Sequence, residues 1–147
     1  MKIATWNING IKARIDAALT WLKQANPDIA CLQEIKCADE AFPRFEFEAL
    51  GYNVAVHGQK GFNGVALLSK LPLEDVDSGL AGDGDDSQAR FIEAVVSLPG
   101  SALRVVSLYL PNGNPVDSDK FPYKLAWMER LAAYARSRLA DEEAFLL

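Results

Sequence analysis

The 147-residue sequence contains only two cysteines, one histidine and no long hydrophobic run. Cys31 and Cys37 are too few for a disulfide framework, and their spacing is not the CxxC of a structural zinc site. Because no stretch of about 18 apolar residues occurs, we expect no contact with a membrane. The start of the sequence turns polar too early for a signal peptide, which together with reduced cysteines predicts a cytoplasmic protein.

Several catalytic and cofactor-binding patterns are also absent. His57, the single histidine, has no partnered serine or cysteine motif, which argues against a catalytic triad. Neither a Walker motif nor a GxGxxG after a strand is present, which argues against a nucleotide cofactor. The net charge of −5 argues against binding of nucleic acid through bulk positive charge. A DNA-acting enzyme remains compatible with this charge, because a local basic rim and a metal ion can serve instead.

The most informative stretch is residues 28–36. It contains an apolar run of strand length and turns polar at Glu34. A strand buried on both faces belongs to an α/β sheet, and such sheets bind ligands beyond their strand ends. The first predicted strand, residues 2–7, ends in a similar way at Asn7 and Asn9. Apolar residues at helical spacing lie between the two strands, so we expect a βαβ unit with parallel neighbouring strands.

The rest of the sequence predicts further elements of both kinds. In order, they are a weak helix over 39–50 with Asp39 as a candidate cap, strands over 52–56 and 64–69, a mobile acidic surface loop over 75–89, a hairpin of strands 91–97 and 103–110, and a long helix from Asp119. We expect the long helix to bury the face formed by Phe121, Leu125, Met128, Leu131, Ala135 and Leu139. The apolar residues 145–147 are typical of the first half of a buried strand.

Three strand ends carry polar side chains that could form one site: Asn7, Glu34, and Tyr109 with Asn112. Carboxylate and amide oxygens suit Mg²⁺ or Mn²⁺. A tyrosine hydroxyl and an asparagine amide can donate hydrogen bonds to phosphate oxygens. The set predicts metal-assisted hydrolysis of a phosphodiester or phosphomonoester. The structural alternative stays open, because tyrosines often end strands and Asn-Gly pairs are mostly turns.

Four motifs, taken together, resemble the exonuclease III family of abasic-site endonucleases, within the endonuclease/exonuclease/phosphatase superfamily. They are TWNING at 5–10, LQEIK at 32–36, GQKGFNGVALLS at 58–69 and YLPNG at 109–113. The resemblance implies an α/β fold, the N-terminal part of a four-layer α/β sandwich with two packed mixed sheets and helices outside. Residues 1–147 would be an incomplete domain, because the family continues with a Gly-Asp-x-Asn segment, later aspartates and a Ser-Asp-His sequence.

The resemblance also assigns roles to individual residues. Glu34 matches the family's metal-ligand glutamate, Asn7 matches the asparagine that orients it and the phosphate, and Asn9 lies close to the metal. Tyr109 matches the active-site tyrosine on the scissile phosphate. The implied catalytic residues are therefore Glu34, Tyr109 and Asn7, and the implied metal ligands are Glu34, Asn7 and Asn9. The implied substrate contacts are Asn112 at the abasic nucleotide, Gly61 and Phe62 in a loop that grips the DNA backbone, and the basic residues Lys12 and Arg14.

The function implied by the resemblance is DNA repair. It consists of Mg²⁺-dependent cleavage of duplex DNA at abasic sites and exonuclease action from 3′ ends, with Mn²⁺ as the alternative cation. The family's general base and its histidine partner belong to the absent segments, so we expect this chain to be impaired or inactive. One alternative is a phosphatase or phosphodiesterase acting on non-DNA phosphates, and another is a non-catalytic nucleic-acid- or protein-binding half-domain. An incomplete sandwich would expose apolar surface, which predicts association of the chain without specifying its oligomeric state.

Overall fold

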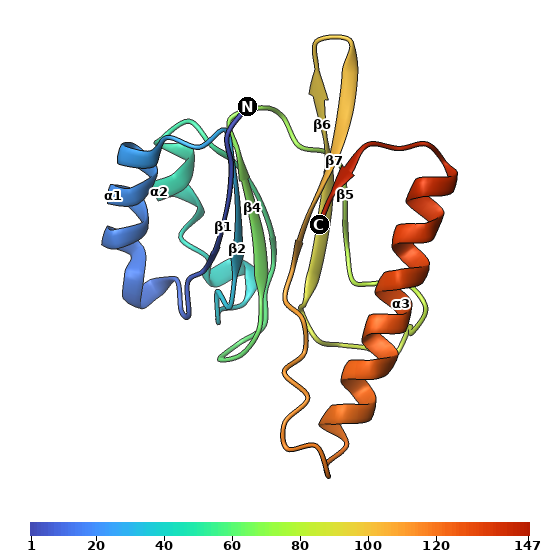
Figure 1. The fold of residues 1–147 in the computed structure, drawn as a ribbon. Helices are drawn as coiled ribbons and strands as arrows, with labels where there is room; N and C mark the ends of the chain where they lie inside the picture. The colour runs from blue at the N-terminus through green and yellow to red at the C-terminus, as the bar shows by residue number, and fades with distance from the viewer.

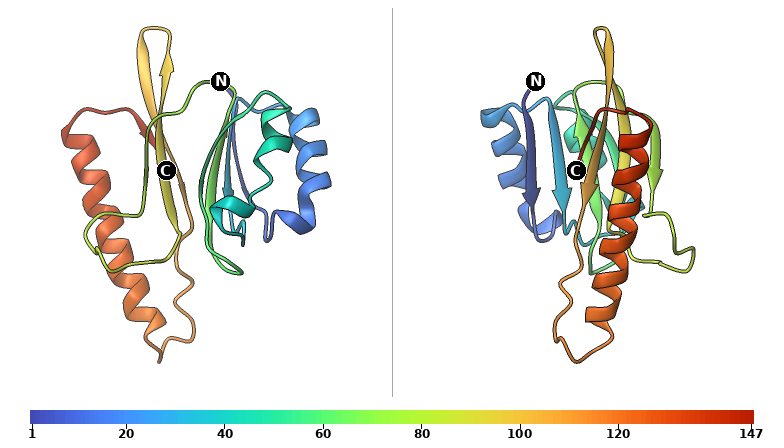
Figure 2. Two further views of the ribbon diagram at one scale, coloured as in Figure 1. Left: turned by 180° about the vertical axis from the view of Figure 1, so that it is seen from behind. Right: turned by 45° about the vertical axis from the view of Figure 1, so that its right-hand side comes forward.

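The structure, a computed structural model, describes residues 1–147. Two four-stranded sheets pack face to face, and helices cover the outer face of each (Figures 1 and 2). The first sheet and its helices comprise β1 (Ile3–Asn7), η1 (Lys12–Arg14), α1 (Ile15–Ala25), β2 (Ile29–Gln33), η2 (Asp39–Ala41), α2 (Arg44–Glu48), β3 (Asn53–His57) and β4 (Val65–Ser69). The second sheet and its helix comprise β5 (Glu74–Ser78), β6 (Phe91–Leu98), β7 (Ser101–Leu108), α3 (Lys120–Ala140) and β8 (Phe145–Leu146). The predicted α/β sandwich of two mixed sheets is confirmed.

The first sheet has the strand order β1-β2-β4-β3, and its β1–β2 pair is parallel. Asn7 lies opposite Gln33, so the two strands end at the same edge of the sheet. Helix α1 connects them and ends at Ala25, and the left-handed backbone of the following residue, Asn26, places Pro27 outside the helix. The predicted βαβ unit is therefore confirmed, and it brings the ends of two strands that are distant in sequence to one place.

The second sheet has the strand order β5-β6-β7-β8. Strands β6 and β7 form the predicted antiparallel hairpin around Pro99 and Gly100, and β8 adds to β7 in parallel. The strand predicted at the end of the sequence is confirmed, but it is not buried. Leu146 and Leu147 are 40% and 47% exposed, because β8 lies at the edge of its sheet.

The two sheets enclose an apolar core built from the inner faces of both. Its buried members include Ile29, Leu67, Ala94, Val96 and Val105. Beside β1 and β8, one edge strand from each sheet, the sheets leave a groove of about 630 Å³ that is lined mainly by apolar side chains. No helix in the structure combines the length and the apolar composition needed to span a membrane.

The single helix predicted over 39–50 is wrong. The segment instead forms two short pieces, η2 and α2, with Phe42 extended between them. Pro43 causes the break, because a residue that precedes proline is disfavoured in the helical region. Asp39 is not a side-chain cap of this segment: its carboxylate accepts a hydrogen bond from the amide of Gly58.

The mobile loop predicted over 75–89 is wrong in its first part. Residues Glu74–Ser78 form strand β5, which pairs antiparallel with β6 through a bulge. All five β5 residues are exposed, so the strand lacks the alternation of apolar and polar residues that reveals most strands. Acidic side chains are common on edge strands because they oppose edge-to-edge association.

The face that α3 buries agrees with the prediction only in part, since Phe121, Leu131 and Ala135 are half-buried. Leu125, Met128 and Leu139 are 46%, 44% and 66% exposed, whereas Trp127 is almost completely buried. The buried face carries the aromatic residues Tyr123, Trp127 and Tyr134, which pack on the second sheet together with Leu131. The hydroxyl of Tyr123 donates to Asp86, so this face satisfies polar groups as well as burying apolar area.

This orientation of α3 can be tested by truncating one residue on each face. Trp127→Ala should lower the free energy of unfolding by about 3–5 kcal/mol, because it empties a fully buried site. Leu125→Ala, the control on the opposite face, should lower it by about 1 kcal/mol or less. Urea denaturation of both variants measures the difference, and a larger loss for Leu125→Ala would show that the helix packs through the other face.

Candidate active site

The backbone at the ends of β1 and β2 holds the candidate site in a fixed shape. The parallel pairing continues beyond the strands, since the amide of Gly10 donates to the carbonyl of Glu34 at 2.7 Å. Asn9, Glu34 and Lys36 have φ values of +48°, +53° and +54°. Asparagine tolerates this left-handed conformation, but it is uncommon for glutamate and lysine. Such conformations persist only where surrounding structure enforces them, and they cluster at functional sites.

The carboxylate of Glu34 is the centre of the site. Its Oε1 atom accepts hydrogen bonds from Asn7 Nδ2 at 2.8 Å and from the Tyr109 hydroxyl at 2.7 Å. Its Oε2 atom lies 3.0 Å from the ammonium of Lys36. The hydrogen bond from Asn7, with those from Tyr109 and Lys36, outweighs desolvation and lowers the pKa of Glu34 to about 2. Glu34 is therefore ionised at neutral pH.

Tyr109 reaches Glu34 from the other sheet, since it directly follows β7. Burial and the hydrogen bond to Glu34 raise the pKa of Tyr109, so its hydroxyl keeps its proton and remains a donor. The guanidinium of Arg90 lies 4.9 Å from the centre of the Tyr109 ring and donates to the Tyr109 carbonyl at 3.2 Å. Three predicted residues, Asn7, Glu34 and Tyr109, therefore meet in one hydrogen-bonded group.

Asn9 and Arg14 lie at the rim of this group. The Asn9 side-chain oxygen accepts a hydrogen bond from Lys36, and the Asn9 carbonyl accepts one from Arg14. The Asn7 side-chain oxygen accepts a hydrogen bond from the amide of Asn9 at 3.2 Å, and its Nδ2 atom donates to Glu34. The Asn7 side chain therefore orients both Asn9 and Glu34. Lys12 lies nearby on η1 but makes no hydrogen bond or ion pair with the site. The structure thus places one predicted basic residue, Arg14, at the site and leaves Lys12 on the surface beside it.

The loop that connects β3 to β4 packs against the turn that carries Glu34. The amide of Gly61 donates to the carbonyl of Lys36 at 3.3 Å. A Cβ atom on Gly64, whose φ is +87°, would lie only 2.5 Å from the Ile35 side chain, so this close approach requires glycine. Phe62 is 70% exposed at the tip of the loop. The aromatic ring is available for stacking on a ligand and is not part of a core.

Asn112 does not contact Glu34. Its side chain accepts a hydrogen bond from Asn114 at 2.6 Å, and its carbonyl accepts one from Lys124 at 3.3 Å. It lines a polar cavity of about 240 Å³ together with Arg90 and Tyr123. Asn112 therefore belongs to a side cavity that is connected to the site through Arg90, which also contacts Tyr109.

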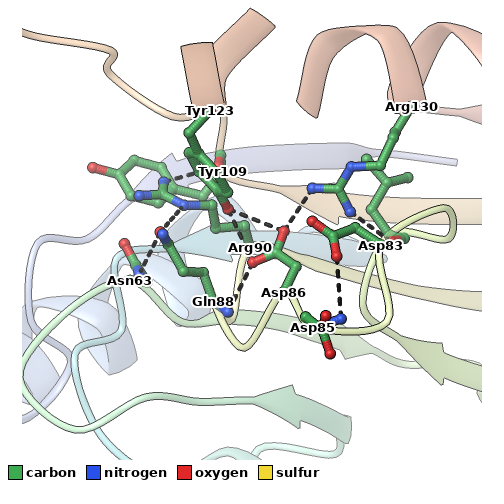
Figure 3. A network of polar contacts seen from close by, with 10 residues as sticks. Asn63, Asp83, Asp85, Asp86, Gln88, Arg90, Tyr109, Tyr123 and Arg130 are labelled. Atoms are coloured by element: carbon green, nitrogen blue, oxygen red, sulfur yellow. Dashed lines mark hydrogen bonds and ion pairs between the residues drawn. The ribbon is translucent and has the colours of Figure 1, made fainter. Parts of the chain in front are cut away.

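A polar network connects this side cavity with helix α3 (Figure 3). Arg130 forms an ion pair with Asp86 at 2.6 Å, and the Tyr123 hydroxyl donates to the same carboxylate at 3.1 Å. The Tyr123 ring lies 6.0 Å below the guanidinium of Arg90. The acidic loop therefore has a structural role at Asp86. No group of three or more His, Cys, Asp or Glu residues gathers to hold a metal ion there or elsewhere.

The donors around Glu34 suit a hard divalent cation. Glu34 Oε2 and the Asn9 side-chain oxygen both contact the Lys36 ammonium, so one cation is within reach of both oxygens. Mg²⁺ sites commonly have one or two carboxylates and complete their coordination with water and substrate phosphate. The Asn7 oxygen already accepts from the Asn9 amide, which favours an orienting role for Asn7.

Two residues of the site had no role in the sequence-based prediction. Lys36 stands two residues after Glu34, and only the left-handed turn reveals that it faces the carboxylate. Arg90 precedes β6 and lies opposite Tyr109 because Phe91 pairs with Leu108 in the hairpin. The hairpin register was the signal that could have identified Arg90, because it places Arg90 beside the end of β7.

The charge state of Glu34 predicts a specific dependence of stability on pH. The folded-state pKa, about 2, lies below the ordinary value of 4.5, so the stabilisation is present above about pH 4.5 and lost as pH falls through about 2. Asn7→Ala should therefore cost about 1–2 kcal/mol at pH 6 in EDTA, and progressively less down to pH 3. Urea denaturation checks this, with Asn112→Ala as the control. A cost for Asn7→Ala that does not change with pH would contradict this account.

Two curated proteins that are similar to the chain are exodeoxyribonucleases. It is 41% identical to exodeoxyribonuclease III of Haemophilus influenzae over 135 residues, which cover 91% of this chain and 51% of that protein. It is 32% identical to exodeoxyribonuclease of Bacillus subtilis over 137 residues, covering 91% of this chain and 52% of that one. The chain thus spans about half the length of the curated relatives it matches.

Solved structures agree with this relationship. The 3′ phosphatase NExo from Neisseria, bound to a product DNA hairpin, superposes with a TM-score of 0.87 at 37% identity and covers 95% of this chain and 53% of its own. An AP endonuclease from Archaeoglobus fulgidus superposes with a TM-score of 0.84 at 41% identity, and the match covers 93% of this chain and 51% of that one. The pattern of the endonuclease/exonuclease/phosphatase family matches residues 4–147, a range that includes every residue of the site. With its sandwich fold and its strand-end carboxylate, the chain belongs to the endonuclease/exonuclease/phosphatase family.

Proposed function

We propose that the site at Glu34 hydrolyses phosphodiester bonds of duplex DNA with Mg²⁺, or alternatively Mn²⁺, at abasic sites and from 3′ ends. The observation that carries the proposal is that the two oxygens of the Glu34 carboxylate have different partners. Oε1 accepts hydrogen bonds from Asn7 and Tyr109, whereas Oε2 contacts a positive charge, the ammonium of Lys36. The similarity to exodeoxyribonuclease III supports the substrate class.

The residues of the site have separable roles in this reaction. When bound, the cation would polarise a phosphate oxygen and neutralise negative charge that develops there. Asn7 and Tyr109 orient the Glu34 carboxylate and keep it ionised. The raised pKa of Tyr109 keeps its single hydroxyl proton in place, and a bound phosphate oxygen could take this hydrogen bond over from Glu34. The guanidinium of Arg90 packs over the Tyr109 ring and so helps to hold the ring in place.

A general base for the attacking water is not among the residues that form this site. Glu34 is the only carboxylate in its network, and a pKa of about 2 makes it a poor proton acceptor at neutral pH. His57, on strand β3, has no hydrogen bond or ion pair with the site residues. We therefore expect slow hydrolysis in which solvent hydroxide attacks.

Duplex DNA fits the surroundings of the site in spite of the net charge of −5. Arg14 and Lys36 lie beside Glu34, and Arg90 and Lys124 lie at the side cavity. Positive charge that is concentrated at one place can attract phosphates even on an acidic protein. Phe62, exposed on the adjacent loop, adds a surface for stacking.

Removal of 3′ phosphates from DNA is a second candidate activity. It is favoured by the similarity to NExo, which is a 3′ phosphatase and was solved with a product DNA hairpin. The same cation and hydrogen-bond donors can act on a terminal phosphomonoester, because both reactions develop charge on phosphate oxygens. A substrate comparison separates the two activities.

The proposal is tested with the purified chain and four substrates: an abasic-site duplex, a duplex with a 3′ phosphate, an undamaged duplex, and a non-DNA phosphomonoester. In Mg²⁺ we expect slow nicking of the abasic duplex, with a rate that rises about tenfold per pH unit because hydroxide is the nucleophile. Glu34→Gln should reduce the rate by about 100-fold or more.

The matched control is Glu74→Gln, which removes an exposed carboxylate on β5 outside the site. It should leave the rate unchanged. Equal nicking by the wild-type chain and Glu34→Gln would indicate a contaminating nuclease and contradict the proposal. Faster hydrolysis of the non-DNA phosphomonoester would favour the non-DNA phosphatase instead.

A further inference from the structure

The side-chain ammonium of Lys36 lies where the proposed metal ion would bind. It contacts Glu34 Oε2 at 3.0 Å and donates a hydrogen bond to the side-chain oxygen of Asn9. We propose that Lys36 is an internal competitor of the metal, which holds these two oxygens together in the metal-free protein and must leave when a divalent cation enters. The inference rests on the proposed function, because it concerns the metal of the same site.

The hydrogen bonds of Glu34 leave little choice about where a cation binds. Oε1 already accepts from Asn7 and Tyr109, at 2.8 and 2.7 Å. A metal that used Oε1 would have to break one of these bonds. Oε2 is contacted only by Lys36, so the oxygen best suited for the metal is the one that the ammonium occupies.

The backbone of Lys36 cannot move aside easily. Its amide donates to the carbonyl of Asn63 at 3.0 Å, and its carbonyl accepts from Gly61 at 3.3 Å. Both neighbours belong to the loop between β3 and β4, and the φ value of +54° reflects this tight attachment. The side chain, in contrast, is 35% exposed and has four flexible methylene groups. Displacement is therefore a movement of the side chain alone.

This arrangement has a consequence for the order of binding. While the ammonium pairs with Glu34, the site already holds one positive charge, which weakens its attraction for a divalent cation. A DNA phosphate offers the displaced ammonium a new anionic partner. Lys36 therefore couples metal binding to the presence of a phosphate, and in the free protein it keeps the metal affinity low.

Mn²⁺ binding measured without DNA tests the inference. Free Mn²⁺ is quantified by electron paramagnetic resonance for the wild-type chain, Lys36→Met, Lys36→Arg and Lys23→Met. Lys36→Met should bind Mn²⁺ about 3- to 10-fold more tightly, since it removes the competing charge at similar side-chain length. Lys36→Arg, which keeps the charge, should stay within about twofold of wild type. Lys23→Met, on α1, makes the same change of net charge away from the site and should also have no effect.

A fourth variant, Glu34→Gln, identifies the site that is being measured, because it should abolish the Mn²⁺ binding. Glu34-dependent binding that is unchanged or weaker in Lys36→Met would overturn the inference and leave the proposed metal function intact. Absence of Glu34-dependent binding in both the wild-type chain and Lys36→Met would overturn both. Circular dichroism confirms that the variants are folded, and Lys36→Arg provides a second comparison that preserves the ion pair.

Discussion

The site depends first on the parallel register between β1 and β2. Asn7 lies opposite Gln33, and the pairing continues as Gly10 donates to the carbonyl of Glu34. A shift of one residue would turn every side chain of a strand to the other face of the sheet. The Asn7 amide could then no longer reach the Glu34 carboxylate.

The second constraint is the packing of the two sheets. Tyr109 belongs to the second sheet, yet it donates to Glu34 on the first. Nearby, the Ser107 hydroxyl donates to the carbonyl of Leu32 at 3.0 Å, and Gln33 donates to Ser107 at 3.3 Å. Buried polar groups at an interface must find partners, so these bonds favour one relative position of the sheets. The site is thus assembled by the sandwich and does not belong to either sheet alone.

The predictability of each feature follows from how local its physical cause is. Asn7 and Glu34 could be placed together from the sequence because a βαβ unit makes its strands parallel. The hydrophobic pattern failed for α3, where Trp127 and two hydrogen-bonding tyrosines select the buried face instead of Leu125 and its neighbours. It failed for β5 because that strand buries none of its side chains. Arg90 was missed because its role depends on the register of the predicted hairpin, in which Phe91 lies opposite Leu108.

Roles in DNA recognition came from the resemblance and not from local physics, and the geometry around them differs from residue to residue. Arg14 lies beside Asn9, whereas Asn112 lies in the side cavity next to Arg90.

The central claim, that Glu34 Oε2 and Asn9 form a cation site, is tested most directly by anomalous X-ray diffraction from crystals soaked in Mn²⁺. The account predicts an anomalous peak about 2.0–2.3 Å from Glu34 Oε2, with the Lys36 ammonium displaced. A peak at the acidic loop instead, or an undisturbed Lys36 beside an empty Glu34, would contradict it.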